Sequence, residues 1–159
     1  MATAAERDLG THQSLALLNH LARVARRGSD AALAPLGLRP LALVALTLLR
    51  DHGSATQQAL AEAMRLDASN LVGLLNELEQ QGLLVRMRDP GDRRRHIVEI
   101  SKPGRARLER AERALAAVQD EVLAGLEEQE RDALYALLLR AAGGQLPSAA
   151  CCQADATDC

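Results

Sequence analysis

Residues 83–101 read LLVRMRDPGDRRRHIVEIS and mark a change of period in the chain. In both halves of this stretch, 83–88 and 96–101, apolar and polar residues alternate, which is typical of β-strands. The tetrapeptide DPGD at 89–92 separates the halves and is a strong turn signal. The stretch therefore predicts a β-hairpin with three consecutive arginines at its tip, which are Arg93, Arg94 and Arg95.

Two helices are predicted directly before this hairpin. A short helix is expected between Ser54 and Leu66, with Thr56 as its N-cap, and a longer one over 68–81, with Asp67 as its N-cap. Their apolar stripes are Leu60, Ala61 and Met64 in the first and Leu71, Leu74, Leu75 and Leu78 in the second. Two helices joined by a tight turn form a helix-turn-helix by shape. When a hairpin follows at once, the arrangement is that of a winged helix.

The chemistry of these elements suits DNA. A helix fits the major groove, where asparagine can pair with adenine and serine can donate or accept. An arginine on a hairpin can enter the minor groove, and the first turns of both helices offer backbone N–H groups to phosphates. Gly73 costs the second helix about 1 kcal/mol relative to alanine. Close approach of DNA or of a neighbouring helix is expected to offset that cost.

The hairpin motif is also similar to that of a known family. DPGDRR at 89–94, a strand, and then Ser101 and Pro103-Gly104 resemble the wing of the MarR family (multiple-antibiotic-resistance regulators) of transcription factors. The family pattern is D-P-x-D-R-R, a strand, and L-T-x-x-G, and Ile100-Ser101 replaces its Leu-Thr here. Leu60-Ala61-Glu62 and residues 78–83 match as well, and the resemblance covers roughly residues 12–142.

The resemblance implies a triangular homodimer in which each protomer places helix 68–81 in the major groove. It implies that Arg94 enters the minor groove and that Asp92 orients Arg94 by an ion pair. Gly73 stands where the family often has a base-contacting arginine, which shifts base reading to neighbouring residues, and Val72 is placed to touch a thymine methyl. The expected DNA-binding residues are Thr56, Gln57, Ser69, Asn70, Val72, Gly73, Asn76, Arg86, Arg88, Asp92, Arg93, Arg94 and Arg95.

Further helices are predicted on both sides of this region. One covers 13–27 and is followed by a break over 28–39, and another begins at Pro40 and stops at Gly53. After the hairpin come a helix from Ser101 to about residue 124 and another over 128–142, whose inward stripe is Leu134, Leu137, Leu138 and Ala141. The expected domains are an N-terminal dimerisation segment, a DNA-binding lobe, C-terminal dimerisation helices and a flexible tail, at 1–36, 37–102, 103–144 and 145–159.

Composition limits the class of protein. The chain has 159 residues, of which 48% are hydrophobic and 25% charged, which suits a globular fold with a core of its own. We expect neither a membrane span nor a secretory signal. All three cysteines, Cys151, Cys152 and Cys159, lie in the last nine residues, which favours a cytosolic protein over one with a disulfide framework. Their role is left open, and a cysteine sensor near the N-terminus is not expected.

Charge is distributed unevenly. The formal net charge is −2, yet the stretch from Arg86 to Arg113 carries ten Lys/Arg against five Asp/Glu, while the rest carries nine against sixteen. One basic stretch is compatible with a local nucleic-acid footprint and also with a solvated helix face. No glycine-rich phosphate loop, G-x-S-x-G sequence or metal-binding helix motif is present, so we expect no enzymatic activity, cofactor or metal.

The predicted fold is therefore mainly α with a small β-hairpin, a winged helix-turn-helix with dimerisation helices at both ends. The predicted function is sequence-specific binding of double-stranded DNA by a homodimeric transcriptional regulator. As the resemblance implies, this would be a repressor that binds a palindromic operator and responds to a small-molecule effector. The alternative is a helical dimer that binds a protein partner, in which the hairpin arginines are mere surface charge.

Overall fold

The computed structural model describes residues 4–89, 91–92 and 95–144, and their side chains from residue 13 onward. Arg93, Arg94 and the three cysteines lie outside the described residues. The elements in chain order are α1 (Ala4–Leu33), the 3-10 helix η1 (Ala34–Leu36), α2 (Pro40–His52), β1 (Ser54–Thr56), α3 (Gln57–Met64), α4 (Ala68–Gln80), β2 (Leu84–Arg88), β3 (His96–Ile100), α5 (Lys102–Val122) and α6 (Glu128–Ala141).

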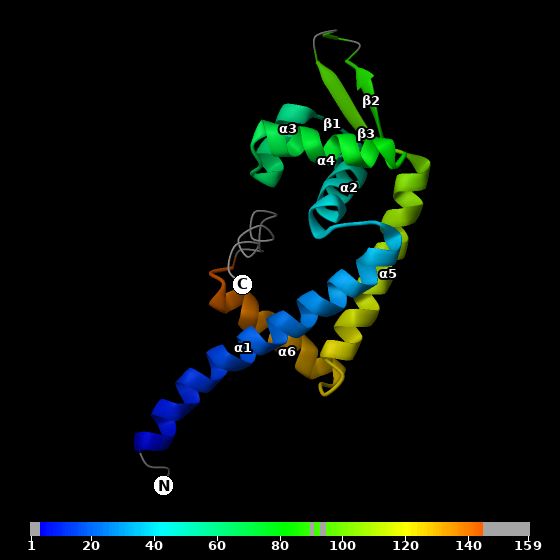
Figure 1. Ribbon diagram of the computed structural model, residues 1–159. Helices are drawn as coiled ribbons and strands as arrows, with labels where there is room; N and C mark the ends of the chain where they lie inside the picture. Colours follow the sequence, from blue (N-terminus) through cyan, green and yellow to red (C-terminus); the bar gives the residue numbers. More distant parts are fainter. Residues whose placement is uncertain (1–3, 90, 93–94, 145–159) are drawn as a thin grey trace.

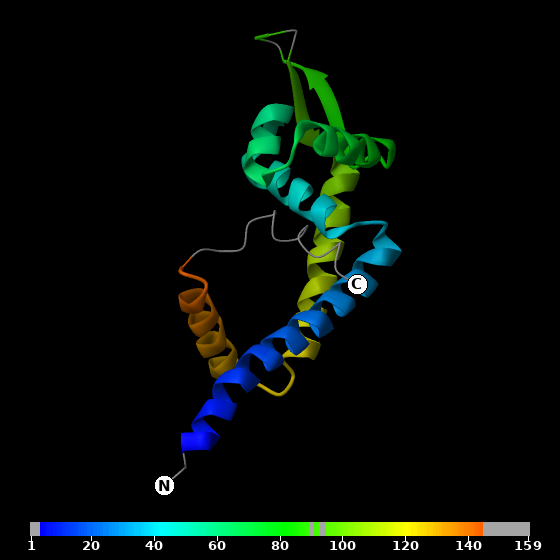
Figure 2. The ribbon, with the colours of Figure 1, turned by 60° about the vertical axis from the view of Figure 1, so that its left-hand side comes forward.

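These elements form a lobe and a set of long helices (Figure 1). The lobe contains α2, α3, α4 and the sheet, and the β2–β3 hairpin projects from it as the wing. Helix α5 leads from the lobe to the opposite end of the molecule, α1 packs along α5, and α6 turns back from the end of α5. The rotated view in Figure 2 shows the same separation of the wing from the N-terminal end of α1. The predicted winged helix-turn-helix between long terminal helices is confirmed.

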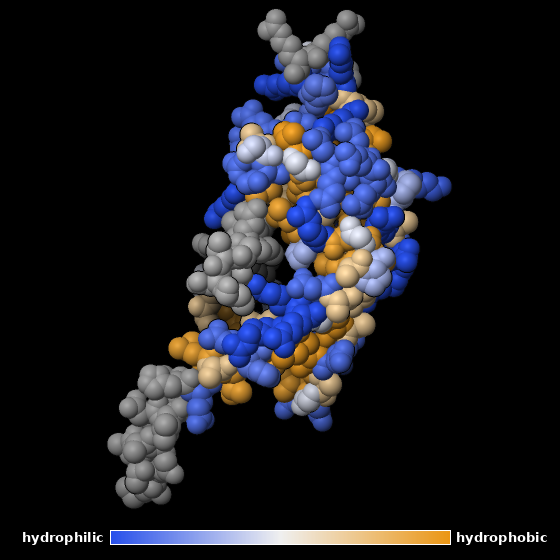
Figure 3. Space-filling model, viewed as in Figure 1, coloured by the Kyte–Doolittle hydropathy of each residue, from blue (hydrophilic) through white to orange (hydrophobic). Residues whose placement is uncertain are grey.

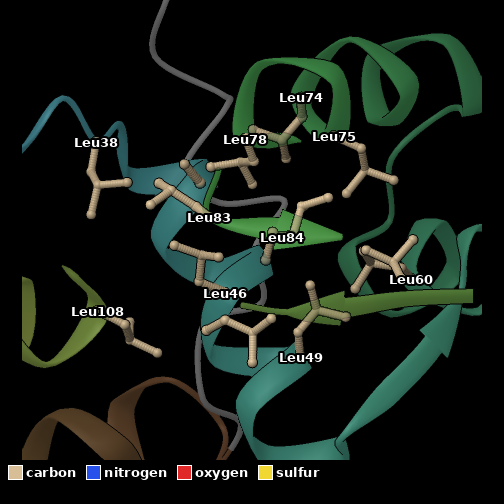
Figure 4. Close-up of a cluster of buried hydrophobic side chains, with 14 of the residues drawn as sticks. Leu38, Leu46, Leu49, Leu60, Leu74, Leu75, Leu78, Leu83, Leu84 and Leu108 are labelled. Atoms are coloured by element: carbon tan, nitrogen blue, oxygen red, sulfur yellow. The ribbon is translucent and has the colours of Figure 1, made fainter. Parts of the chain in front are cut away.

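The core of the lobe is built mostly from leucine. Leucines of α2, α3, α4 and the start of β2 converge in one cluster (Figure 4). The stripes predicted for the two central helices are confirmed, since Leu60 and Met64 of α3 are buried, as are all four leucines predicted for α4. This packing fixes which face of α4 points outward, and so it positions the candidate site.

The predicted hairpin is part of a three-stranded sheet of order β1-β3-β2. Strand β3 pairs antiparallel with β2, with Arg88 opposite His96, and with β1, with Ser54 opposite Glu99. The short helix begins at Gln57, within the predicted stretch, and Ser54–Thr56 before it form the strand β1. Thr56 is its N-cap as predicted, because its hydroxyl oxygen accepts a hydrogen bond from the backbone N–H of Ala59 at 3.1 Å.

The predicted break after residue 27 is wrong, because α1 continues through Gly28 to Leu33. A Cβ at Gly28 would lie only 2.7 Å from Cγ1 of Val118 on α5. The glycine therefore serves the close contact of two helices and does not end the first. The break begins at Ala34, and Pro40 opens α2 in its first turn as predicted.

The stripe predicted to face inward from α6 is also wrong within one protomer. No residue of α6 is buried there, and Leu137 and Leu138 are 59% and 42% exposed. Periodicity identified a helix with an apolar face, but the described part of this chain does not cover that face. Helix α5 begins as predicted, because the hydroxyl of Ser101 accepts a hydrogen bond from the N–H of Gly104 at 3.0 Å.

Candidate nucleic-acid interface

Helix α4 presents a polar face away from the leucine core. Its first turn is capped by Asp67, whose carboxylate accepts hydrogen bonds from the backbone N–H groups of Ser69 and Asn70, both at 3.0 Å. The Ser69 hydroxyl donates to the same carboxylate at 2.5 Å, and the Asn70 amide Nδ2 also donates to it. The Ser69 hydroxyl and these other donors lower the pKa of Asp67 from 3.8 to about 2.

This cap changes one part of the phosphate prediction. The backbone N–H groups of Ser69 and Asn70 were expected to be free for a DNA phosphate, but the Asp67 carboxylate occupies both. An ionised carboxylate at that end of α4 also repels a phosphate. The first turn of α4 is therefore suited to base edges, which carry no net charge, better than to the DNA backbone.

Gly73 lies in the middle of the exposed face of α4. No atom lies within 4 Å of the position that a Cβ would take there among the residues that the structure describes. Close packing against a neighbouring helix of the same protomer is therefore not what offsets the cost of this glycine. The approach of DNA, the second explanation that the sequence offers, is part of the proposed function.

Arg86 of β2 lies against α4, beneath the polar face. Its side chain is 18% exposed, and its Nη1 donates to Oδ1 of Asn76 at 2.7 Å and lies 3.4 Å from Oε2 of Glu79. Its Nε and Nη2 are buried without a hydrogen-bond partner among the described residues. The guanidinium is thus held between the wing and α4 and connects the two elements.

The described part of the wing tip is closed by backbone hydrogen bonds. The N–H of Asp89 donates to the carbonyl of Arg95 at 3.0 Å, and the N–H of Arg95 donates to the carbonyl of Asp92 at 2.8 Å. The Nε of Arg95 also lies 3.7 Å from Oδ2 of Asp92. Arg88 and Arg95 are exposed.

The structure brings residues of the wing and of the helix-turn-helix together. A cleft of about 180 Å³ is lined by Thr56, Gln57, Gln58, Arg95 and His96. Two of these, Gln58 and His96, were not predicted as site residues. His96 is the first residue of β3 and directly follows the three wing arginines in the sequence. This position beside the arginines could have indicated that His96 belongs to the site. Thr56 and Gln57 are partly covered, while His96 is exposed.

The character of the surface changes along the molecule. In the space-filling view the wing end is mostly hydrophilic, whereas apolar residues reach the surface along the helices at the opposite end (Figure 3). Exposed apolar side chains occur on α1, with Leu15, Leu17, Leu18, Leu21 and Val24, and on α6, with Tyr135, Leu137 and Leu138. The two ends of the molecule are thus suited to different partners.

The lobe and its wing define a winged helix-turn-helix protein, and the comparisons place it in one family. Residues 38–96 match the model of the MarR family. The HTH-type transcriptional repressor NicR of Pseudomonas putida is 33% identical over 101 residues, which cover 64% of each chain. The structure of the transcriptional repressor CouR bound to a 23-mer DNA duplex has 33% identity and a TM-score of 0.70, covering 85% of this chain and 95% of that one.

A third relative has a structure that concerns regulation of DNA binding by 6-hydroxynicotinic acid. This is BpsR of Bordetella bronchiseptica, with 25% identity and a TM-score of 0.64, covering 79% of this chain and 90% of that one. The chain belongs to the MarR family, which consists of DNA-binding transcriptional regulators and not of enzymes. It spans 64% of the length of NicR, a little under two thirds. No single helix within the described residues has the length and hydropathy of a membrane span, and one bent pair, residues 13–36 with Pro40–His52, passes only when both are taken together.

Proposed function

We propose that this protein is a cytoplasmic transcriptional regulator that binds double-stranded DNA in a sequence-specific manner. The observation that carries the proposal is Gly73, an exposed glycine in mid-helix with no described atom within 4 Å of its Cβ position. Around it Ser69, Asn70 and Asn76 present polar groups on one exposed face of α4. A helix that inserts into the major groove can use such hydrogen-bonding groups, and a glycine between them lets its backbone approach the base edges closely.

The proposed regulator acts as a homodimer. Leu15 and Leu17 of α1 are each 63% exposed and Leu137 of α6 is 59% exposed, so the terminal helices leave apolar surface that one protomer does not cover. Such surface is typical of an interface. We assign dimerisation to residues 1–36 and 103–144 and DNA binding to 37–102. A two-fold dimer then requires a palindromic operator.

In this proposal the wing contacts the minor groove and the DNA backbone. Arg88 and Arg95 are exposed on it, and the sequence adds Arg93 and Arg94 at the tip. Thr56 and Gln57, at the start of α3, lie with Arg95 in one cleft, which suits a phosphate. The predicted roles of Val72 as a thymine contact and of Asp92 in orienting Arg94 are part of the same proposal.

A small-molecule effector is proposed to act where the dimerisation helices meet the lobe. A cavity of about 380 Å³ there is lined by Pro35, Leu36, Gly37, Gln81, Arg107 and Arg110. Nη1 of Arg107 donates to Oε1 of Gln81 at 3.2 Å, directly after α4. An anionic ligand that competes for Arg107 would release this link to α4. The relatives NicR and CouR are repressors by name, which favours repression that a ligand relieves.

The test is selection of bound duplexes from a random pool, followed by fluorescence anisotropy across a salt series. We expect a palindromic site, with an affinity for random duplex that is weaker by about a thousand-fold or more. The logarithm of the affinity is expected to fall linearly with the logarithm of the salt concentration. A stable dimer that leaves every duplex unbound would instead support the helical protein-interaction module.

A further inference from the structure

The polar residues on α4 are held by partners that can form hydrogen bonds in only one direction. An ionised carboxylate only accepts hydrogen bonds, and a guanidinium only donates them. An asparagine beside a carboxylate therefore turns its Nδ2 toward the carboxylate, and an asparagine beside a guanidinium turns its Oδ1 toward the guanidinium. In both cases the other half of the amide faces away from the partner.

At the start of α4 the fixed partner is Asp67. Because the pKa of Asp67 is lowered to about 2, the carboxylate stays ionised and accepts at any pH at which DNA is bound. Asn70 must therefore turn its Nδ2 toward Asp67, as it does, and Oδ1 is left to face outward. The Ser69 hydroxyl hydrogen also points to this carboxylate, and its lone pairs remain free. Both side chains thus offer acceptors, which are Oδ1 of Asn70, beside the second N–H of its Nδ2, and the lone pairs of the Ser69 hydroxyl.

About two turns further along α4 lies Asn76, whose fixed partner is Arg86 of β2. Nη1 of Arg86 donates to Asn76 at 2.7 Å, so Asn76 must accept through Oδ1 and keeps the two N–H donors of Nδ2 free. Glu79, on the same helix, lies 3.4 Å from Nη1 and helps to hold the guanidinium in place. Asn76 is exposed while the Arg86 side chain is only 18% exposed, so the free donors face outward.

We propose that α4 reads DNA with a fixed polarity, in which Ser69 and Asn70 accept hydrogen bonds from bases and Asn76 donates them. In the major groove adenine and cytosine present an amino donor, whereas guanine presents two acceptors, N7 and O6, and adenine and thymine present one acceptor each, N7 and O4. Ser69 and Asn70 therefore select adenine or cytosine, and Asn76, with two donors, selects guanine as the base with two adjacent acceptors. Oδ1 keeps a second lone pair, but Arg86 turns this oxygen toward the wing, so Asn76 meets a base edge with its Nδ2 donors and not with both ends of its amide as the two-bond pair with adenine requires. Arg86 is a positioning residue that sets this preference.

This inference rests on the proposed function, and selection from a random pool tests the two separately. The Asn76→Ala variant identifies the base position that Asn76 reads, because the preference there is lost. At that position the wild-type protein is expected to select guanine. In Arg86→Met the side chain keeps its length but cannot donate, so Oδ1 of Asn76 is released. The ratio of guanine to adenine at this one position should then fall by about five- to ten-fold.

Arg88→Met is the matched control, because it makes the same change two residues along the same strand on an exposed side chain. It should weaken binding to all duplexes and leave the selected sequence unchanged. If Arg86→Met does not fold, Asn76→Asp serves in its place, since it keeps an oxygen for Arg86 and removes both donors. The guanine preference should be lost in that variant.

Three results would overturn the inference while the proposed function stands. The first is adenine in the wild-type site at the position that Asn76→Ala identifies, and the second is an identical preference there in Arg86→Met. A selected sequence that Asn76→Ala leaves unchanged also overturns it, because Asn76 then reads no base. If the wild-type protein selects no sequence at all, the proposed function fails as well.

Discussion

Replacing Gly73 with alanine should change folding and DNA binding in opposite directions. The added methyl group meets no described atom within 4 Å, so no steric cost opposes it in the free protein. The position is helical and exposed, and alanine is favoured over glycine there by about 0.5–1 kcal/mol. The free energy of unfolding should rise by that amount, which corresponds to an increase in Tm of about 1–4 °C for a chain of this size.

The same methyl group should weaken binding to the operator. In the proposed complex the backbone of α4 approaches the base edges at Gly73, and the polar groups of Asn70 and Asn76 lie on either side of it. A methyl group at the point of closest approach holds the helix away and lengthens the hydrogen bonds on both sides. We expect a loss of about 1–2 kcal/mol, which is roughly a five- to thirty-fold increase in Kd.

Urea unfolding measures the first effect, and fluorescence anisotropy with operator duplex measures the second. Gly125→Ala is the control, because no described atom lies within 4 Å of its Cβ position either and it lies between α5 and α6, outside the lobe. Its affinity for the operator should equal that of the wild-type protein. A more stable Gly73→Ala protein that binds the operator as tightly as the wild type would refute the reasoning, since DNA would then not approach this face.

Three further predictions concern the dimer, the cap of α4 and the wing. Leu137→Asp places a charge on the exposed apolar face of α6. Light scattering should then show a shift from the dimer toward the 17.0 kDa monomer. An unchanged molecular mass would show that α6 is not part of the dimer interface. Asp67 stabilises the fold above its ordinary pKa of 3.8, and this contribution is lost as the pH falls through about 2. In Asp67→Ala the free energy of unfolding, measured with urea, should therefore fall less steeply between these two pH values than in the wild-type protein. An equally steep fall in both proteins would contradict this prediction. Arg94→Ala should cost operator binding about 1–3 kcal/mol with an unchanged Tm, and an unaltered operator affinity would count against the wing assignment.

The lobe could be predicted from the sequence because its signals are local. The alternation in 83–101, the DPGD turn and the leucine stripe of α4 each lie within one element, and each predicted the element that the structure contains. Strand β1 could not be found in the same way. It has only three residues, too few for a period, and it exists because its backbone pairs with β3 some forty residues later in the chain.

The misplaced end of α1 has a related cause. A glycine usually signals the end of a helix, and only the contact between Gly28 and Val118, ninety residues apart, shows that this one serves packing. For the same reason only part of the candidate site could be predicted from the sequence. The residues on the outward face of α4 followed from the period of its leucines, but the pairing of Asn76 with Arg86 did not, because it depends on how the wing folds against the helix.

Helix α5 joins the proposed dimer interface to the proposed DNA contacts by polar links as well as by the chain. Nη1 of Arg50, on α2, lies 2.5 Å from Oε1 of Glu112 on α5, and Arg107 of α5 donates to Gln81 directly after α4. The lobe is thus linked to α5 at two separate points, one on α2 and one directly after α4. We expect a shift of α5 to be passed to the lobe through both links. A ligand that alters how two protomers pack would therefore change the spacing of the two α4 helices, and with it the operators that the dimer can span.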